Sequence, residues 1–321
     1  GPPMARFLIS RLAQSVVLLL GVSVVGFMLM HLAPGGPLAL YTLNPTVTAQ
    51  DIERIKVQFG LDQPAYIQYL KWASGMATGN WGYSFFGGQQ VREIVLDRVP
   101  ATLLLMGSAL ALALVIGVTI GIVSAVRRNS IFDYASAIAS MLALSLPTFW
   151  FGLLAIFVFA QTLGWLPAGG MVSTGGGGFV DRVQHLVLPV VVLALVLVAQ
   201  WSRYTRSSML EILDQDFMRT ARSKGLTSSR VLLNHGLRAA LVPLVTLAGL
   251  QLPLLVGGAL VAETVFSWPG MGLLFLSALG TRDYPVLMAI LMVGAFVVIL
   301  GNLLADIVVA FVDPRVKLGH D

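Results

Sequence analysis

The sequence predicts an all-α integral membrane protein with six membrane-spanning helices. The 321-residue chain is 57% hydrophobic and only 11% charged, and its mean hydropathy is +0.85. Soluble globular domains contain about 25% charged residues. A chain this apolar therefore has too little polar surface to face water on all sides, and a bilayer is its natural solvent.

Six segments contain the ~20 mostly apolar residues that a helix needs to cross a bilayer. These segments are 7–31, 99–126, 134–163, 186–202, 239–262 and 286–311. Pro147 interrupts the third segment, while Pro243 and Pro253 interrupt the fifth. Each proline removes a backbone hydrogen bond, so kinks are expected there. Gly117 and Gly121 give the second segment a small-residue face, which we expect to serve helix packing within the chain.

Lysine and arginine predict the orientation of the spans. Most of the twenty basic residues flank one set of span ends, including Arg127, Arg128 and those in the stretch 203–238. Because cytoplasmic loops are enriched in basic residues, both termini and this stretch are predicted to be cytoplasmic. Residues 1–3, which precede Met4, are interpreted as an expression-vector remnant. The first apolar run lacks a small-residue cleavage site and is interpreted as a retained span.

The predicted domain layout follows from these spans. Residues 4–33 form the N-terminal membrane helix, and residues 34–98 form an extracytoplasmic region with two helical stretches rich in aromatic residues. These aromatics are expected to anchor at lipid headgroups or to pack a small cap, and contact with a partner is the alternative. Residues 99–312 contain the other five spans, and residues 313–321 form a cytoplasmic tail.

The sequence offers no enzyme site. No lysine is followed by serine or threonine, so the chain has no phosphate-binding loop of the Gly-x-x-x-x-Gly-Lys-Ser/Thr type and is not expected to hydrolyse ATP. It contains no cysteine, and its four histidines show no zinc-binding spacing. We therefore expect no catalytic residues, no cofactor and no bound metal.

Ionisable residues near the spans are the default functional candidates in a membrane protein. Asp306 lies about one turn from the inner end of the sixth span, where a structural pairing, for example with Arg315, is favoured over a functional role. Glu263 follows the fifth span and, with Trp268, forms a candidate outer gate. The alternative is that Glu263 caps a re-entrant turn.

The basic segment 214–238 predicts a helix, a glycine stop and a second helix. Asp214 and Asp216 are candidate N-caps, and Gly225 suits the residue that ends a helix. A short helical knuckle between two spans suits the docking of a cytosolic partner, and a solvated basic loop is the alternative. The apolar positions on one side of the knuckle are Phe217, Met218 and Ala221.

A series of short segments, each weak alone, is highly specific in its order along the chain. The segments are Gly60–Pro64, Tyr69–Trp72, Arg98–Thr102, Ser145–Gly152, Leu163–Gly169, Ala262–Gly270, Arg282–Pro285 and Asp313–Arg315. Together they make residues 4–317 resemble the permease subunits of ATP-binding-cassette (ABC) importers, in particular the B-type dipeptide/oligopeptide permeases. That family includes nickel and glutathione relatives.

The resemblance implies a type I (MetI-like) transmembrane domain with an extracytoplasmic insert between helices 1 and 2. It also implies that the knuckle is the cytoplasmic coupling loop, called the EAA loop, which docks in an ATPase subunit. Here Arg219 replaces the glutamate of the EAA pattern, and Arg238 replaces its proline. The residues expected to couple to the ATPase are Phe217, Met218, Arg219, Thr220, Ala221, Arg222, Lys224 and Gly225.

The resemblance further implies the partners and the location. The expected partners are a homologous second permease, two ABC ATPase subunits, an extracytoplasmic substrate-binding protein and membrane lipid, with no nucleic acid. The expected location is a bacterial or archaeal plasma membrane. The favoured substrates are short peptides, and nickel chelates or glutathione are alternatives. A stand-alone secondary transporter or channel is the alternative from another class, although it usually needs intramembrane acids, and this chain offers only Asp306 and Glu263 near span ends.

Overall fold

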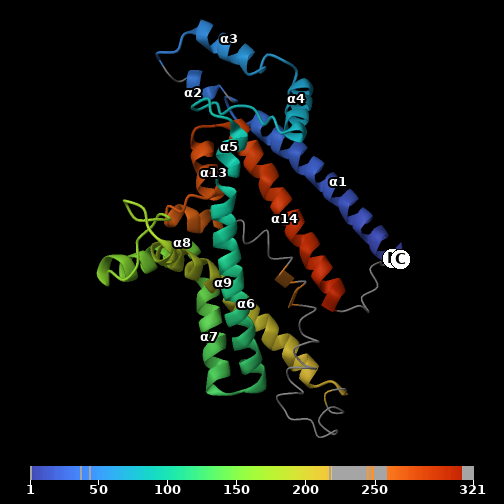
Figure 1. Ribbon diagram of the computed structural model, residues 1–321, viewed down its shortest axis with the longest axis vertical. Coiled ribbons are helices and arrows are strands. Elements are labelled where there is room, and N and C mark those ends of the chain that lie inside the picture. The colour runs from blue at the N-terminus through green and yellow to red at the C-terminus, as the bar shows by residue number, and fades with distance from the viewer. Residues whose placement is uncertain are drawn as a thin grey trace. The chain divides into compact units, whose positions relative to one another are not determined.

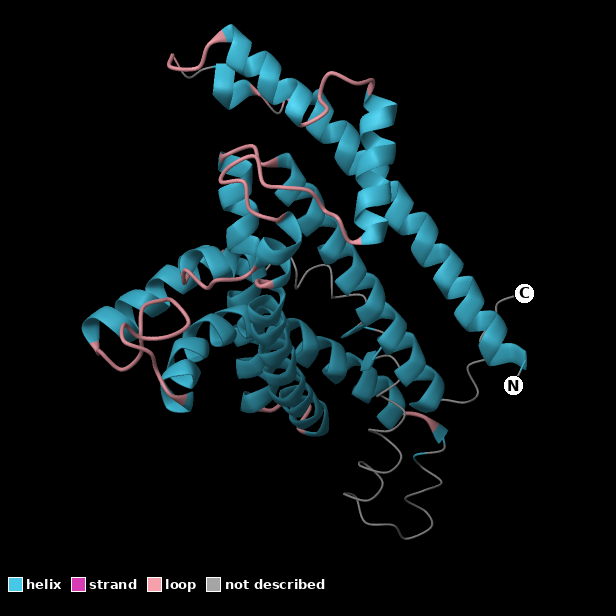
Figure 2. Ribbon diagram, turned by 45° about the horizontal axis from the view of Figure 1, so that its top comes forward, coloured by secondary structure: helices cyan, strands magenta, loops and turns pink. Residues whose placement is uncertain are grey.

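The computed structural model describes residues 2–36, 38–42, 45–216, 218, 244–245, 247–248 and 259–312. Every regular element in these ranges is a helix, and their only β-type pairing is an isolated bridge between Tyr83 and Gln90 (Figures 1 and 2). The prediction of an all-α protein is therefore confirmed. The described chain divides into two compact units, 1–100 with 270–299 and 101–269 with 300–321.

Four of the described helices are long and apolar enough to cross a membrane. They are α1 (Pro2–Leu32), α6 (Val99–Val126), α9 (Phe179–Leu213) and α14 (Tyr284–Val312). They match the predicted first, second, fourth and sixth spans, and α9 extends well beyond the predicted 186–202 at both ends. The predicted fifth span, 239–262, lies mostly outside the described residues.

The third predicted span is not one straight helix. α7 (Ile131–Ser145) is followed by α8 (Thr148–Ala155) and a π-helical stretch, η1 (Ile156–Thr162), and the chain bends by 102° between α7 and α8. The kink predicted at Pro147 is thus present. At 102° it turns the chain through more than a right angle, so α7 and α8 do not continue in one direction as a single kinked span would. Leu146 is extended, with φ −88° and ψ 131°, because a residue before proline avoids the helical region.

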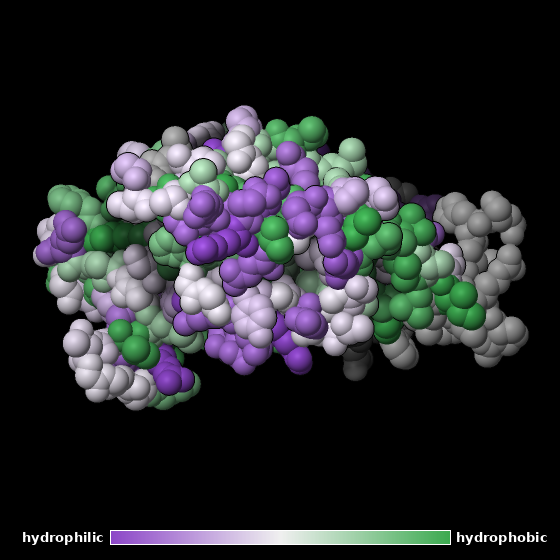
Figure 3. Space-filling view, turned by 90° about the horizontal axis from the view of Figure 1, so that it is seen from above, coloured by the Kyte–Doolittle hydropathy of each residue, from purple (hydrophilic) through white to green (hydrophobic). Residues whose placement is uncertain are grey.

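The first unit contains α1, the first part of α14 and the short helices of the 34–98 region. These short helices are α2 (Ala39–Thr42), α3 (Ala49–Gln58), α4 (Ala65–Thr78) and α5 (Val91–Leu96), and α13 (Met271–Gly280) precedes α14. Val91, Val95 and Leu287 are buried in the core of the unit. Hydrophilic residues gather over much of the face seen from the end that carries α2, α3 and α4 (Figure 3).

The 34–98 region is tied to α1 and to the start of α14. Tyr69 and Ser23 share a hydrogen bond of 2.8 Å between their hydroxyls, and His31 Nε2 lies 3.0 Å from Gln68 Oε1. Asp283, only 4% exposed, accepts hydrogen bonds from the Ser84 hydroxyl and from the Phe85 backbone N–H. The buried carboxylate therefore fixes the loop before α5 to the residue that directly precedes α14.

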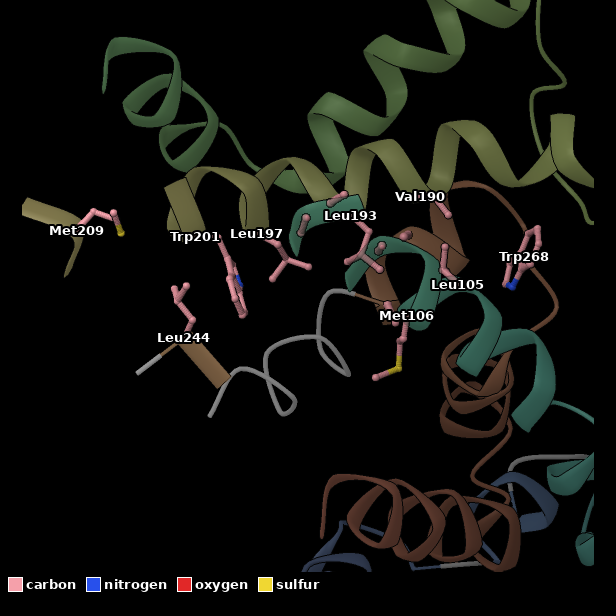
Figure 4. Close-up of a cluster of buried hydrophobic side chains, with 14 of the residues drawn as sticks. Leu105, Met106, Val190, Leu193, Leu197, Trp201, Met209, Leu244 and Trp268 are labelled. Atoms are coloured by element: carbon pink, nitrogen blue, oxygen red, sulfur yellow. The ribbon is translucent and has the colours of Figure 1, made fainter. Parts of the chain in front are cut away.

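The core of the second unit lies where α6 packs against α9 (Figure 4). A Cβ added to Gly117 would lie 2.8 Å from Trp201 Cβ, and one added to Gly121 would lie 2.5 Å from Thr205 Cβ. Real Cβ atoms do not approach so closely, so glycine at both positions is what lets the backbones meet. The predicted use of this small-residue face for packing within the chain is confirmed.

Candidate functional site

The predicted outer gate lies in a tight turn, which we call the outer turn (residues 262–270). Residues 259–265 are helical, and the turn that follows is closed by a hydrogen bond from Trp268 N to the Glu263 carbonyl at 2.8 Å. Ser267 has a left-handed backbone, with φ 49°, which a non-glycine residue adopts only at some cost. The chain therefore reverses sharply and brings both candidate gate residues together.

Both candidate gate side chains bond to the start of α6. Thr102 Oγ1 donates to Glu263 Oε1 at 2.6 Å. Trp268 Nε1 donates to the Ala101 carbonyl at 2.9 Å. Glu263 and Trp268 are each 0% exposed, so the outer turn belongs to the core of the second unit. A gating motion at this turn would have to break these two bonds or move the start of α6 with it.

Two further segments close around the outer turn. Gly170 N donates to the Phe266 carbonyl at 2.8 Å, and a Cβ on Gly169 would lie 2.5 Å from the same oxygen. A Cβ on Gly152 would lie 3.0 Å from Val265 Cγ1. Residues 101–102, 152, 169–170 and 263–268, which are far apart in the sequence, therefore meet at one place in the second unit.

A Ser–Asp–His cluster lies near the N-terminal end of α9, but it lacks the geometry of a catalytic triad. His185 Nε2 lies 3.2 Å from Ser173 Oγ and 3.6 Å from Asp181 Oδ1, while His185 Nδ1 lies 3.0 Å from the Gly169 carbonyl. In a triad the carboxylate binds the nitrogen opposite the serine. Here both groups approach the same nitrogen, so the cluster holds the 163–178 loop in place. In the described part of the chain, no three His, Asp or Glu residues gather as a metal site would require.

A cavity of about 330 Å³ opens in the first unit. Its walls come mainly from α1, α4, the 80–85 segment and the start of α14; they contain many aromatic residues, with Lys71 among the polar ones. Aromatic packing surrounds it, since the ring centroids of Phe27 and Tyr69 are 5.4 Å apart and those of Phe59 and Phe85 are 4.4 Å apart. Tyr69, Trp72, Trp81 and Phe85 are therefore partly buried in a small cap, while Tyr66, Tyr83 and Phe86 remain 67%, 56% and 70% exposed.

The structure describes only part of the predicted coupling loop. α9 ends at Leu213, and Asp214 is its C-cap rather than the N-cap of a new helix. Met218 is 0% exposed and belongs to the same buried cluster as Met209, Ile212 and Leu244. Phe217, Arg219, Thr220, Ala221, Arg222, Lys224 and Gly225 lie outside the described residues, so their role stays a prediction.

Asp306 is partly buried on α14, and it has an interaction partner. Its predicted partner, Arg315, lies outside the described residues. The pairing between these two residues therefore stays a prediction.

One polar site was not predicted from the sequence. Asp133 in the first turn of α7 binds Arg206 on α9 through two hydrogen bonds of 2.6 and 2.8 Å. The Ser130-x-x-Asp133 spacing identifies the helix start, because the Ser130 hydroxyl accepts from Asp133 N at 3.2 Å. Nothing in the spacing points to a partner 73 residues away.

Comparison with known proteins accounts for nearly the whole chain. A family model described as "Binding-protein-dependent transport system inner membrane component" matches residues 117–318, and the model of its N-terminal part matches residues 4–106. The chain is 44% identical to the oligopeptide transport system permease protein AppB of Bacillus subtilis over 316 residues, covering 98% of this chain and 100% of that protein. It is 37% identical to the dipeptide transport system permease protein DppB of Alkalihalophilus pseudofirmus, with 98% and 100% coverage.

A solved structure supports the fold. The chain is similar to the MetNI methionine ABC transporter in its inward-facing conformation, with a TM-score of 0.55 and 22% identity over 68% of this chain and 96% of that chain. At this identity the likeness shows the fold alone, which is the predicted type I importer architecture. Taken with the two matches along the sequence, it leads to one conclusion: the chain belongs to the family of inner membrane components of binding-protein-dependent transport systems.

Proposed function

We propose that this chain is one of two homologous permease subunits that enclose the translocation path of an ATP-driven importer of short peptides. The observation that carries the proposal is the similarity to an oligopeptide permease, 44% identity along the full length of both chains. The long apolar helices supply the membrane body that such a subunit needs. As a member of its family, the chain is a transport subunit and not an ATPase.

The proposed energy supply is a pair of ABC ATPase subunits on the cytoplasmic side, and an extracytoplasmic binding protein is proposed to deliver the peptide. The coupling loop, residues 214–238, is the proposed contact with one ATPase. Support comes from its place in the chain, because it follows directly from α9, a helix that runs unbroken from Phe179 to Leu213. Met218 is buried in the unit itself, so it anchors the start of the loop, and the cations Arg219, Arg222 and Lys224 are proposed for the rim of the contact.

The candidate outer gate is proposed to act as one piece with the start of α6. Glu263 and Trp268 are both buried against Thr102 and Ala101, so neither side chain faces a solute in this conformation. Opening on the outer side is therefore proposed to move the outer turn and α6 together. This is a rigid-body motion of the kind found in switching transporters.

The test is uptake by the reconstituted assembly. The chain is co-expressed with a second permease, ATPase subunits and a binding protein from the same operon, and proteoliposomes are supplied with radiolabelled di- to pentapeptides. Uptake is expected only with ATP and the binding protein, and unlabelled peptides are expected to compete. Competition by glutathione or a nickel chelate but not by peptides would overturn the substrate assignment. Uptake driven by an ion gradient without ATP would overturn the importer assignment.

A further inference from the structure

The inner half of α9 is joined to the start of α7 by a buried carboxylate and an arginine. Arg206 donates from Nε to Asp133 Oδ1 at 2.6 Å and from Nη2 to Oδ2 at 2.8 Å, the two-pronged geometry that arginine forms with carboxylates. The Asn129 backbone N–H donates to the same Oδ2 at 3.1 Å. Asp133 is only 3% exposed, so these three donors take the place of water around its charge.

The same stretch of α9 is held on two sides. Ser202, one turn before Arg206, lies with its hydroxyl 3.2 Å from that of Ser140 on α7. Towards α6, a Cβ on Gly121 would lie 2.7 Å from the Ser202 carbonyl. The three helices are therefore in contact along residues 202–206, and close packing of this kind leaves no room for one helix to slide past another.

The ion pair lies near the C-terminal end of α9, the helix that leads into the proposed coupling loop. α9 ends at Leu213, about two turns beyond Arg206. Met209 and Ile212 in these turns are buried in the same cluster as Met218. A displacement of the coupling loop would therefore reach α9 within two turns of the ion pair.

We propose that Asp133 and Arg206 form a permanent clamp, here called the inner clamp, which makes α6, α7 and α9 move as one body during transport. The inference rests on the proposed function of the chain as an ATP-driven permease. Both residues are positioning residues, because they act by passing a displacement of the coupling loop to three helices. Lysine at position 206 would keep the charge but lose the two-pronged bond.

The test uses the complete transporter in proteoliposomes and measures peptide taken up per ATP hydrolysed, together with the melting temperature. Arg206→Gln and Asp133→Asn are expected to hydrolyse ATP while moving at least about fivefold less peptide per ATP, the lower range of a coupling between two sites. Arg206→Lys is expected to fall between these variants and the wild type. Exchanging the two residues, Asp133→Arg with Arg206→Asp, is expected to recover part of the ratio. Arg203→Gln is the matched control, since Arg203 is an exposed arginine one turn earlier on α9.

A second measurement decides the matter even if the single variants fail to assemble. The chain contains no cysteine, so Asp133→Cys with Arg206→Cys can be joined by a short bis-maleimide linker. If the clamp is permanent, a link between the two positions restrains no motion that transport needs. The linked transporter is therefore expected to keep uptake within about twofold of the wild type, a small change in free energy.

Two results would overturn the proposal. One is loss of uptake on linking, which would mean that α7 and α9 separate during the cycle. The other is a wild-type ratio of peptide to ATP in Arg206→Gln at unchanged melting temperature. By contrast, absence of ATP-dependent uptake in the wild type would count against the proposed function and not against the clamp.

Discussion

The outer turn and the inner clamp hold the second unit together by different means. At the outer turn, Glu263 and Trp268 are fully buried and their bonds go to residues at the start of α6. At the inner clamp, the Arg206 side chain is 33% exposed, although the Asp133 side chain is only 4% exposed. Burial and shape therefore fix the outer turn, whereas charge and orientation fix the inner clamp. We therefore expect substitutions at the outer turn mainly to lower stability, and substitutions at the inner clamp mainly to lower the proposed coupling.

The largest expected effect is at the outer turn. Trp268→Ala should lower the free energy of unfolding by about 3–5 kcal/mol, because it leaves a cavity in the core. Trp268→Phe keeps most of the ring and removes the bond to the Ala101 carbonyl, so about 1 kcal/mol is expected. Unfolding of the purified subunit in detergent measures both. Trp165→Ala is the control, since Trp165 is 66% exposed, and an equal loss there would break the contrast between buried and exposed sites.

The next effect tests whether shape also matters near the inner clamp. Gly121→Ala should cost about 1–3 kcal/mol of unfolding free energy by overpacking, because the new Cβ would meet Thr205 and Ser202. Gly107→Ala on the same helix meets nothing within 4 Å. It should be neutral or stabilising by up to about 1 kcal/mol, since alanine is the better helix former. Similar melting temperatures for the two variants would show that α6 and α9 are not in close contact.

A smaller effect separates a gate from a structural tie at Glu263. Glu263→Gln keeps an acceptor for the Thr102 hydroxyl, so a loss of about 1 kcal/mol or less in unfolding free energy is expected. Glu263→Ala removes that acceptor and should cost about 1–3 kcal/mol. Uptake and melting temperature are measured together. If Glu263→Gln abolishes uptake at unchanged melting temperature, the carboxylate has a gating role that its structural contacts do not require.

The smallest effect is expected at Asp51, an exposed carboxylate at the start of α3 whose contribution can be compared with that of the buried carboxylates. The side-chain hydrogen bond from Thr48, helped by the Thr48 backbone N–H, lowers the pKa of Asp51 below its ordinary value of 3.8. Because this pKa is depressed in the folded state, the cap stabilises α3 above the ordinary pKa and is lost as the pH falls through the lowered value. Amide hydrogen exchange in α3, normalised to α4, should therefore rise only in strong acid. Thr48→Ala should raise it already at neutral pH, and unchanged exchange in that variant would contradict the capping role.

The features that could be predicted from the sequence are the local ones. The apolar runs predicted α1, α6 and α14, and Pro147 predicted the break after α7, because hydropathy and backbone chemistry act within a few residues. The two glycines of α6 predicted a packing face. They did not predict that α9 is the helix that packs against this face. The sharpness of the break could not be predicted, since it depends on what α8 packs against.

The features that could not be predicted are pairings between distant residues. Thr102 and Glu263 are 161 residues apart, and Ser84 and Asp283 are 199 apart. Many serines, threonines and acids could have formed such pairs, and periodicity does not choose among them. Glu263 is a candidate from the sequence because ionisable residues near spans are the default functional candidates, and Trp268 lies in the segment that follows it. Their burial could not be predicted, because it depends on Thr102 and Ala101, which lie 161 and 167 residues away in the sequence.

The bond between Trp268 and position 101 ends on a main-chain oxygen. Any residue small enough for that crowded position presents the same oxygen, so Ala101→Gly or Ala101→Ser leaves the acceptor in place. Substitutions at position 101 are thus limited by size, while at position 268 the indole N–H is the group that makes the bond. A small residue can therefore replace Ala101 without loss of the bond, whereas any replacement of Trp268 by a residue without an N–H at that place loses it.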